Sequence, residues 1–173
     1  MCLVPSLTHH KTRSNGDPIP FMAAVPILVW KRLRKKKEAD GYTPLRDIRN
    51  RSYLGSSPYY DESYFNGKLM DTVEFDFGVG SSHYVKDVEA GYHAYRTYND
   101  ADYYNMLYGH DNEYVFPGII PMGSLVIIGN ENRNEIVSTA LVMFRNLTEL
   151  ENVYGKVGPG VEVAKAIQRN ILK

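Results

Sequence analysis

A chain of 173 residues, 43% of them hydrophobic, is long enough to bury one core, so wholesale disorder is excluded. The formal net charge is zero, which disfavours general nucleic-acid binding. Eleven Lys and Arg against four Asp and Glu give residues 1–60 a balance of +7, and residues 61–173 carry −7. Cys2 is the only cysteine. One thiol excludes an internal disulfide and a cysteine-based zinc site, and it suits a reducing cytosol.

The chain begins with a polar stretch followed by an apolar one. Residues 1–18 contain turn signals such as Asn15-Gly16 and are predicted to form a flexible N-terminal arm, so one domain is expected over 19–173. The apolar run 19–30 is interrupted by two prolines, whereas a membrane-spanning helix needs about twenty apolar residues. Basic residues follow this run, whereas in a signal peptide they precede it. We therefore predict a buried strand over 27–33, a cytoplasmic protein and no membrane partner.

The next segments show first turn signals and then an alternation of polar and apolar residues. Residues 41–68 are rich in Gly, Ser, Pro and Tyr and are predicted to form a long ordered loop. Residues 70–77 alternate in polarity, which predicts a strand with one wet face that ends at Gly78. A second strand is predicted over 88–95, where the internal Gly91 indicates a bulge or a close backbone approach.

A helix is predicted over 97–108. Thr97 and Asp100 have the spacing of a capping box, and Gly109 supplies a stop signal. Ala101, with later residues of the segment, forms an apolar stripe. This helix would follow directly on the strand that contains Gly91.

The last third of the chain holds its most apolar segments. Residues 118–128 and 136–144 predict a long-looped hairpin at the centre of a sheet, and 161–172 carries a helical apolar stripe. Together these patterns predict an α+β fold: a single domain with a mainly antiparallel twisted sheet and two or three short helices.

The strand–helix junction at residues 91–98 is the strongest candidate site. A helix N-terminus offers free amides and a favourable dipole to an anion, and Arg96 could add bidentate recognition of phosphate. Tyr92, Tyr95 and Tyr98 supply rings for stacking. Twelve of the fourteen tyrosines lie between Tyr53 and Tyr114, and the alternative is that they line the wet face of a sheet. The alternative is that His93 and Arg96 are structural. The predicted ligand-binding residues are Tyr92, His93, Tyr95, Arg96, Thr97 and Tyr98.

Other chemistry finds little support in the sequence. His83, His110, Asp111 and Glu113 lack the helical or hairpin spacing of metal ligands, so no metal and no cofactor is expected. Cys2 could serve as an N-terminal nucleophile, but the short apolar pair Leu3-Val4 that follows it meets a proline at once and then a polar segment. No phosphate-binding glycine loop or hydrolase motif is present. Catalytic residues are therefore left unassigned.

Several short motifs stand out along the chain: Met1-Cys2-Leu3, Val29-Trp30-Lys31, Ser57-Pro58-Tyr59, Gly91-Tyr92-His93-Ala94-Tyr95, Ile119-Ile120-Pro121-Met122-Gly123 and Val137-Ser138. Together they resemble a loosely defined group of small uncharacterised proteins of phages, other large DNA viruses and some bacteria. In that group a G-[FY]-H strand precedes a short helix and is followed by IP-x-G and a terminal hairpin. Apart from Met1-Cys2-Leu3, the resemblance covers residues 27–145, and it implies no established activity.

A weaker likeness is to the ADP-ribosyltransferase-like fold, where a glycine-aromatic strand also leads into a helix, as Gly91-Tyr92 leads to Thr97 and Ala101 here. That resemblance implies an Arg or His on the first strand, a role for Arg32, and a late glutamate at the nicotinamide ribose, a role for Glu135. Outside a recognisable motif, these residues are more typical of a binding derivative than of a transferase.

The leading hypothesis is a viral, non-catalytic cytosolic binding protein that engages a host protein or sequesters a small anionic, nucleotide-like ligand. The alternative is an ADP-ribosyltransferase-like enzyme that uses NAD. A third hypothesis, nucleic-acid binding through the basic run 31–37, is disfavoured because such runs are usually solvated. The sequence leaves the oligomeric state open.

Overall fold

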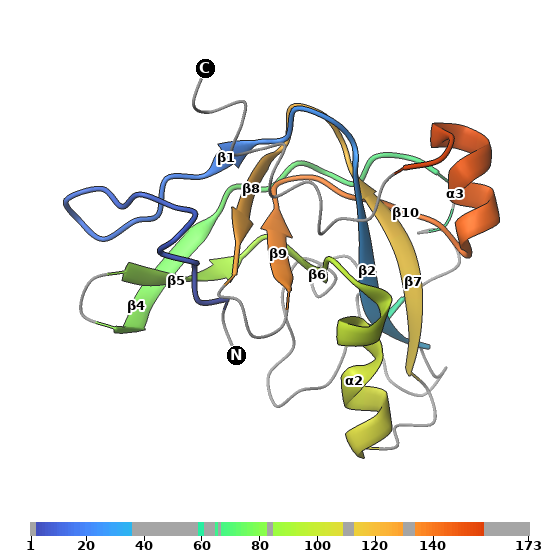
Figure 1. Ribbon diagram of the computed structural model, residues 1–173, viewed down its shortest axis with the longest axis horizontal. Helices are drawn as coiled ribbons and strands as arrows, with labels where there is room; N and C mark the ends of the chain where they lie inside the picture. The colour runs from blue at the N-terminus through green and yellow to red at the C-terminus, as the bar shows by residue number, and fades with distance from the viewer. Residues whose placement is uncertain are drawn as a thin grey trace.

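The computed structural model describes residues 3–35, 59–60, 65, 67–82, 85–108, 113–129 and 134–157. These residues form an eight-stranded sheet, a two-stranded sheet and two helices (Figure 1). The main path of the large sheet runs β1-β8-β9-β6-β2-β7-β10, and β3 pairs with β2. The predicted α+β class with a mainly antiparallel sheet is confirmed.

The middle of the sheet is built from β2 (Ile27–Lys35) and β7 (Glu113–Ile120). They pair antiparallel over eight positions, from Ile27 opposite Ile120 to Arg34 opposite Glu113. The strand predicted over 27–33 is confirmed. On its other side β2 meets β6 (Tyr92–Tyr95), with Trp30 opposite Tyr95. β3 (Tyr59–Tyr60) runs parallel to the end of β2.

The predicted C-terminal hairpin is confirmed in part. β8 (Leu125–Ile128) and β9 (Glu135–Ser138) pair antiparallel, but a turn at residues 121–124 separates β7 from β8. Residues 139–141 likewise separate β9 from β10 (Val142–Met143), which pairs with β7. The hairpin lies beside β1 (Phe21–Met22), so it lies toward one edge of the sheet instead of at its centre.

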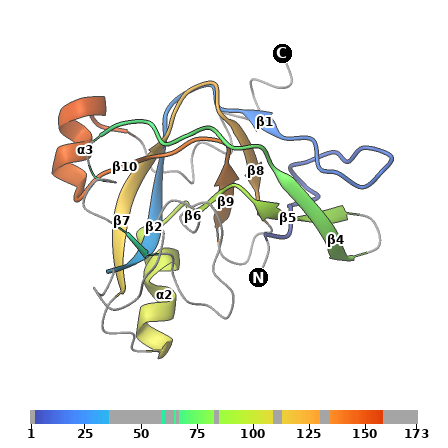
Figure 2. The same cartoon turned by 180° about the vertical axis from the view of Figure 1, so that it is seen from behind.

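The strand predicted over 70–77 is wrong in position. Residues 67–75 run as an extended segment across one face of the sheet (Figure 2), and Met70 N and Val73 N donate to the carbonyl oxygens of Leu141 and Thr139 at 3.0 and 2.9 Å. The strand β4 spans Asp76–Ser82 and pairs with β5 (Val85–Ala90). Gly78 therefore does not end a strand.

Gly91 divides the strand predicted over 88–95 into β5 and β6. Its φ is +140°, and a Cβ atom there would lie 2.6 Å from Cγ2 of Val137. The predicted close backbone approach is thus confirmed, because only glycine combines this backbone conformation with this proximity to β9.

Two helices are described. The predicted helix is confirmed as α2 (Tyr98–Tyr108), which lies at the lower end of β2 and β7 in Figure 1. The second helix, α3 (Leu147–Tyr154), was not predicted from the sequence. The side chain of Asn146 caps it by accepting from Glu149 N at 2.9 Å. The helix predicted over 161–172 lies outside the described residues.

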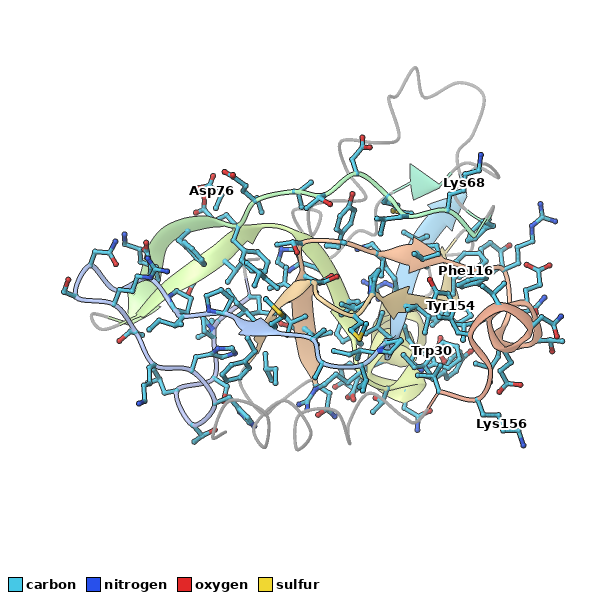
Figure 3. All side chains as sticks on the ribbon, turned by 90° about the horizontal axis from the view of Figure 1, so that it is seen from above. Trp30, Lys68, Asp76, Phe116, Tyr154 and Lys156 are labelled. Carbon is cyan, nitrogen blue, oxygen red and sulfur yellow. The ribbon has the colours of Figure 1, made fainter. Side chains whose placement is uncertain are left out.

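The core lies on both faces of the sheet. On one face, the side chains of Ile27, Val29 and Leu33 belong to the largest cluster, which the segment 67–75 helps to cover. On the other face, Leu28 and Trp30 join a cluster under α3 that includes Tyr154, labelled with Trp30 in Figure 3. This alternation follows from the period of two along a strand.

The segment predicted as a flexible arm packs onto the sheet over residues 3–18. Leu3 is fully buried in a cluster with Val88, Ile127 and Val137. Ser6 N donates to the carbonyl oxygen of Ile128 at 2.9 Å. Composition suggested an arm because the segment is polar, but backbone hydrogen bonds and buried Leu3 hold it in place.

None of the described helices is long and apolar enough to cross a membrane.

Candidate functional site

The strand β6 presents the predicted site residues to opposite faces of the sheet. Tyr92 and Ala94 face the largest core cluster, and His93 and Tyr95 face the other side because successive side chains alternate. The hydroxyl of buried Tyr92 donates to the carbonyl oxygen of Asp71 at 2.6 Å. Tyr92 therefore ties the segment 67–75 to the core and presents no ring for stacking on a ligand.

His93 is buried between two strands. Its Cα partner on β9 is Val137. Its carbonyl oxygen accepts a hydrogen bond from the ammonium group of Lys31, which is itself buried in β2. Sequence analysis did not single out Lys31, because its neighbours in the basic run suggested a solvated position.

Arg96 is fixed by one neighbour, Asn134. Arg96 N donates to Asn134 O at 2.8 Å, and Arg96 Nη2 donates to Asn134 Oδ1 at 2.9 Å. The side chain is only 7% exposed, and burial lowers the pKa of its guanidinium while the nearby Asp100 carboxylate opposes that shift. Asn134 has a φ of +49°, a conformation that Asn adopts more readily than most residues.

The first turn of α2 is capped by the protein's own side chains. Asp100 N donates to Thr97 Oγ1 at 3.2 Å, which is the first of the two bonds of the predicted capping box, and the Thr97 hydroxyl donates to Asp100 Oδ2. Asn134 Nδ2 donates to the same carboxylate oxygen at 2.8 Å. The Asp100 carboxylate thus supplies the negative charge that the helix N-terminus and Arg96 favour.

Tyr98 is the one predicted site residue with a largely exposed ring, at 47%. It contacts Trp30 edge to face, with ring centroids 5.3 Å apart. The six predicted residues therefore lie in different surroundings. Tyr92 faces the largest core cluster, His93 and Arg96 are buried, and Tyr95 is half-buried on the face of His93. Thr97 caps the helix and Tyr98 is exposed. The burial of His93 and Arg96 is what the alternative, a structural role for these two residues, expects.

The two residues implied by the ADP-ribosyltransferase resemblance lie on the same face of the sheet. Glu135 is opposite Tyr95, and Tyr95 is opposite Trp30. Arg32 lies two residues beyond Trp30, hence on the same face. His93, on the intervening strand, shares that face. Arg32 and His93 are both buried.

A metal site finds no support in the part of the chain that the structure describes, where no group of three His, Cys, Asp or Glu side chains converges. Cys2, His83, His110 and Asp111 lie outside the described residues. Of the predicted acid–base set only the backbone of Glu113 is described, at the start of β7.

A surface that sequence analysis missed lies where β1 meets β8. Met22 and Met122 are 61% and 69% exposed, and Val25 and Leu125 are exposed as well. Met22 is the Cα partner of Leu125. Gly123 N donates to Ala23 O at 2.7 Å and Ala23 N donates to Ser124 O at 2.8 Å, so the turn that carries Met122 lies against the chain after β1. We call Met22, Val25, Met122 and Leu125 the apolar patch.

The apolar patch comes from two runs that contain no charged residue, Pro18–Val29 and Tyr114–Gly129. Hydrophobicity alone suggested core strands. The available signal was the turn chemistry: Pro26 and Gly123 flank the exposed residues, and turns lie at the surface. Apolar residues beside a turn are therefore candidates for exposure.

The fold defines a single α+β domain in which Thr97, Asp100 and Asn134 bond to one another at the polar junction, and its sheet edge carries an apolar surface. Comparison with family models, with curated proteins and with solved structures gives no match for this chain. The functional proposal therefore rests on the geometry.

Proposed function

We propose that the protein is a non-catalytic binding protein and that its ligand is a partner protein which presents an uncharged apolar segment to the apolar patch. The observation that carries this proposal is the pair of exposed methionines, Met22 and Met122, beside exposed Val25 and Leu125 on hydrogen-bonded segments. Single exposed apolar residues are ordinary, whereas adjacent ones mark interaction sites.

The composition of the patch defines the chemistry of the partner. Neither run that forms it contains a charge, so the patch offers no ion pair to a nucleic acid, a phosphate group or an acidic peptide. Methionine is unbranched and polarizable, and it adapts to irregular apolar surfaces. Binding to the patch is therefore expected to be driven by apolar burial and to change little with salt.

The expected energy follows from the area of two side chains. Burying one large apolar side chain contributes roughly 1.5–3 kcal/mol before the costs of association. Replacing both methionines by lysine removes that contribution and places two charges in the interface. The dissociation constant is then expected to rise at least about 100-fold.

A small anionic ligand at the start of α2 has weaker support. The Asp100 carboxylate occupies that position, accepting from Thr97 and Asn134. A bound anion would meet a like charge there.

The test compares proteins retained by the immobilised wild type and by a Met22→Lys/Met122→Lys double variant, at low and high salt. Val153→Lys, an exposed substitution on α3, is the matched control. A protein retained by wild type and control, lost with the double variant and insensitive to salt is then purified and titrated calorimetrically. Patch-independent or strongly salt-dependent retention overturns the proposal. Patch-dependent self-association in analytical ultracentrifugation replaces the partner with a second copy of the chain.

A second candidate is an ADP-ribosyltransferase-like enzyme that uses NAD. One observation favours it: Arg32, His93 and Glu135 lie on one face of three neighbouring strands. Incubation with labelled NAD and cell extract tests it. Label transfer that Glu135→Gln abolishes supports the enzyme, and the absence of transfer by the wild type rejects it.

A further inference from the structure

Residues 3–19, which we call the N-terminal strap, contact the sheets at three places. Leu3 and Val88 exchange two backbone hydrogen bonds of 3.2 and 2.9 Å at one end. Ser6 N donates to Ile128 O in the middle. At the far turn, Lys86 N donates to Gly16 O at 3.0 Å, and Lys86 Nζ lies 2.9 Å from Asp17 Oδ1. Figure 1 shows this turn projecting beyond the β4–β5 hairpin.

A single histidine fixes the middle of the strap. Ile128 N, at the end of β8, donates to His10 Nε2 at 2.8 Å, and His10 Nδ1 lies 2.9 Å from Ile19 O. The ring stacks on Phe21 of β1, with centroids 4.2 Å apart. His10 is only 4% exposed.

These contacts require one protonation state. Because Nε2 accepts a hydrogen bond from an amide, it cannot carry a proton. Nδ1 faces a carbonyl oxygen, so it carries the proton and donates. A protonated imidazolium would turn Nε2–H against the N–H of Ile128. The folded strap therefore holds His10 neutral.

The described strands that contact His10 supply no compensating negative charge. β8 (Leu125–Ile128) and β1 (Phe21–Met22) contain no titratable residue. On the strap itself, His9 and Lys11 are the nearest charged or titratable neighbours in sequence, and the charge of His9 also disfavours protonation of His10. Asp17 is engaged with Lys86 at the far turn. Burial accordingly lowers the pKa of His10 from 6.5 to about 4.

We propose that His10 is an acid-sensitive latch, whose protonation releases the N-terminal strap from β8 while the large sheet stays folded. When the strap opens, His10 enters water and takes up a proton at its ordinary pKa, so acid favours the open form. Release frees Ser6 and His10 from Ile128 and exposes the apolar surface beneath Leu3. This surface adjoins the apolar patch on β8, and the latch does not depend on the proposed function.

The size and window of the effect follow from the two pKa values of His10. The contribution of neutral His10 to closing is complete well above pH 6.5, falls as the pH drops below 6.5 and levels off near pH 4. Opening is expected to become about 30-fold more favourable at pH 5 than at pH 8. The Asp17 carboxyl, whose pKa Lys86 holds below its usual value, keeps its charge through this window. His9 is the second imidazole on the strap, with Nδ1 2.7 Å from Ser6 Oγ, so its contribution has to be separated from that of His10.

Hydrogen exchange tests the latch. In the wild type, exchange of the Ile128 amide and of residues 3–19, corrected for its intrinsic pH dependence, is expected to accelerate about 30-fold from pH 8 to pH 5. His10→Gln keeps an amide oxygen near the position of Nε2 and does not titrate, so its exchange should be flat with pH. His9→Gln removes the neighbouring imidazole and should retain most of the acceleration.

Each outcome of the hydrogen-exchange experiment either supports or overturns the latch. Acceleration confined to the strap and Ile128, and absent in His10→Gln, supports the latch. Equal acceleration at Val29 in the middle of β2 means global acid unfolding and overturns it, as does a flat profile in the wild type. Should His10→Gln fail to fold, the wild type still decides, through the comparison of Ile128 with Val29 and through the His10 imidazole titration in NMR.

Discussion

The junction before α2 and the apolar patch where β1 meets β8 differ in whether their side chains bond to other side chains of the protein or face solvent. The junction is rich in polar and aromatic residues, yet Thr97, Asp100 and Asn134 bond to one another or to Arg96. The patch has no polar side chain among its four residues, yet it is exposed. The comparison teaches that polar composition does not by itself mark a binding site. What matters is whether the groups already have partners within the fold.

The largest expected effect contrasts a glycine at each region. Gly91→Ala forces a Cβ atom to 2.6 Å from Val137 at a φ of +140°, and it should destabilise the fold by about 4 kcal/mol. Gly123→Ala, beside the patch, meets nothing within 4 Å and should cost about 1 kcal/mol for its positive φ alone. Urea denaturation of both variants measures the difference. Equal losses would show that the junction is not tightly packed.

A slightly smaller effect is expected at Asn134. Asn134→Ala removes the acceptor of the Arg96 guanidinium and the donor to Asp100, leaving two charged groups with fewer bonds. The expected loss is about 3 kcal/mol in urea denaturation. Asn99→Ala, an exposed substitution in the first turn of α2, should change stability by less than about 0.5 kcal/mol. If Asn134→Ala lowers the unfolding free energy only slightly, the hydrogen bonds of Asn134 contribute little to stability and the junction remains a candidate for another role.

Substitutions in the apolar patch should destabilise the fold less than substitutions at the junction. Met22→Lys and Met122→Lys place charges in water, so each should change the unfolding free energy by less than about 0.5 kcal/mol. Thermal denaturation of the single variants checks this. A large destabilisation would mean that the methionines are part of the core, which would remove the basis of the proposed docking surface.

The smallest structural effect is expected from oxidation. Dilute peroxide should convert Met22 and Met122 to sulfoxides well before Met70 and Met143, because the latter two are buried. Mass spectrometry of peptides gives the order, and the fold should persist through the first two modifications. Partner binding should fall with them, since the sulfoxide is polar.

Signals within a short stretch of sequence, such as a helix cap or an apolar run, predicted α2 and β2. The capping box of Thr97 and Asp100 located α2, and the apolar run located β2. Gly78 was read as a stop, although the structure uses it in a strand where a Cβ atom would meet the Glu89 side chain at 1.8 Å. Gly78 and Glu89 come together only when the chain folds, so the residues next to Gly78 in the sequence do not predict this contact. The cap formed by Asn146 and Glu149 was present in the sequence but was overlooked.

The candidate site was less predictable than the fold. The sequence showed that Arg96 and Thr97 lie at a strand–helix junction, but it could not show that Asn134, far along the chain, would satisfy both Arg96 and Asp100. The burial of His10 depends in the same way on Ile128, 118 residues away. Such partners are set by the pairing of strands, which a local pattern does not contain.

The shortness of the outer strands has a consequence for colloidal behaviour. A chain with zero formal net charge at pH 7 gains no protection from mutual repulsion. The strands at the two ends of the main sheet path, β1 and β10, have two residues each, so they offer a neighbouring molecule almost no backbone ladder on which to polymerise. Lengthening either strand is therefore expected to promote aggregation.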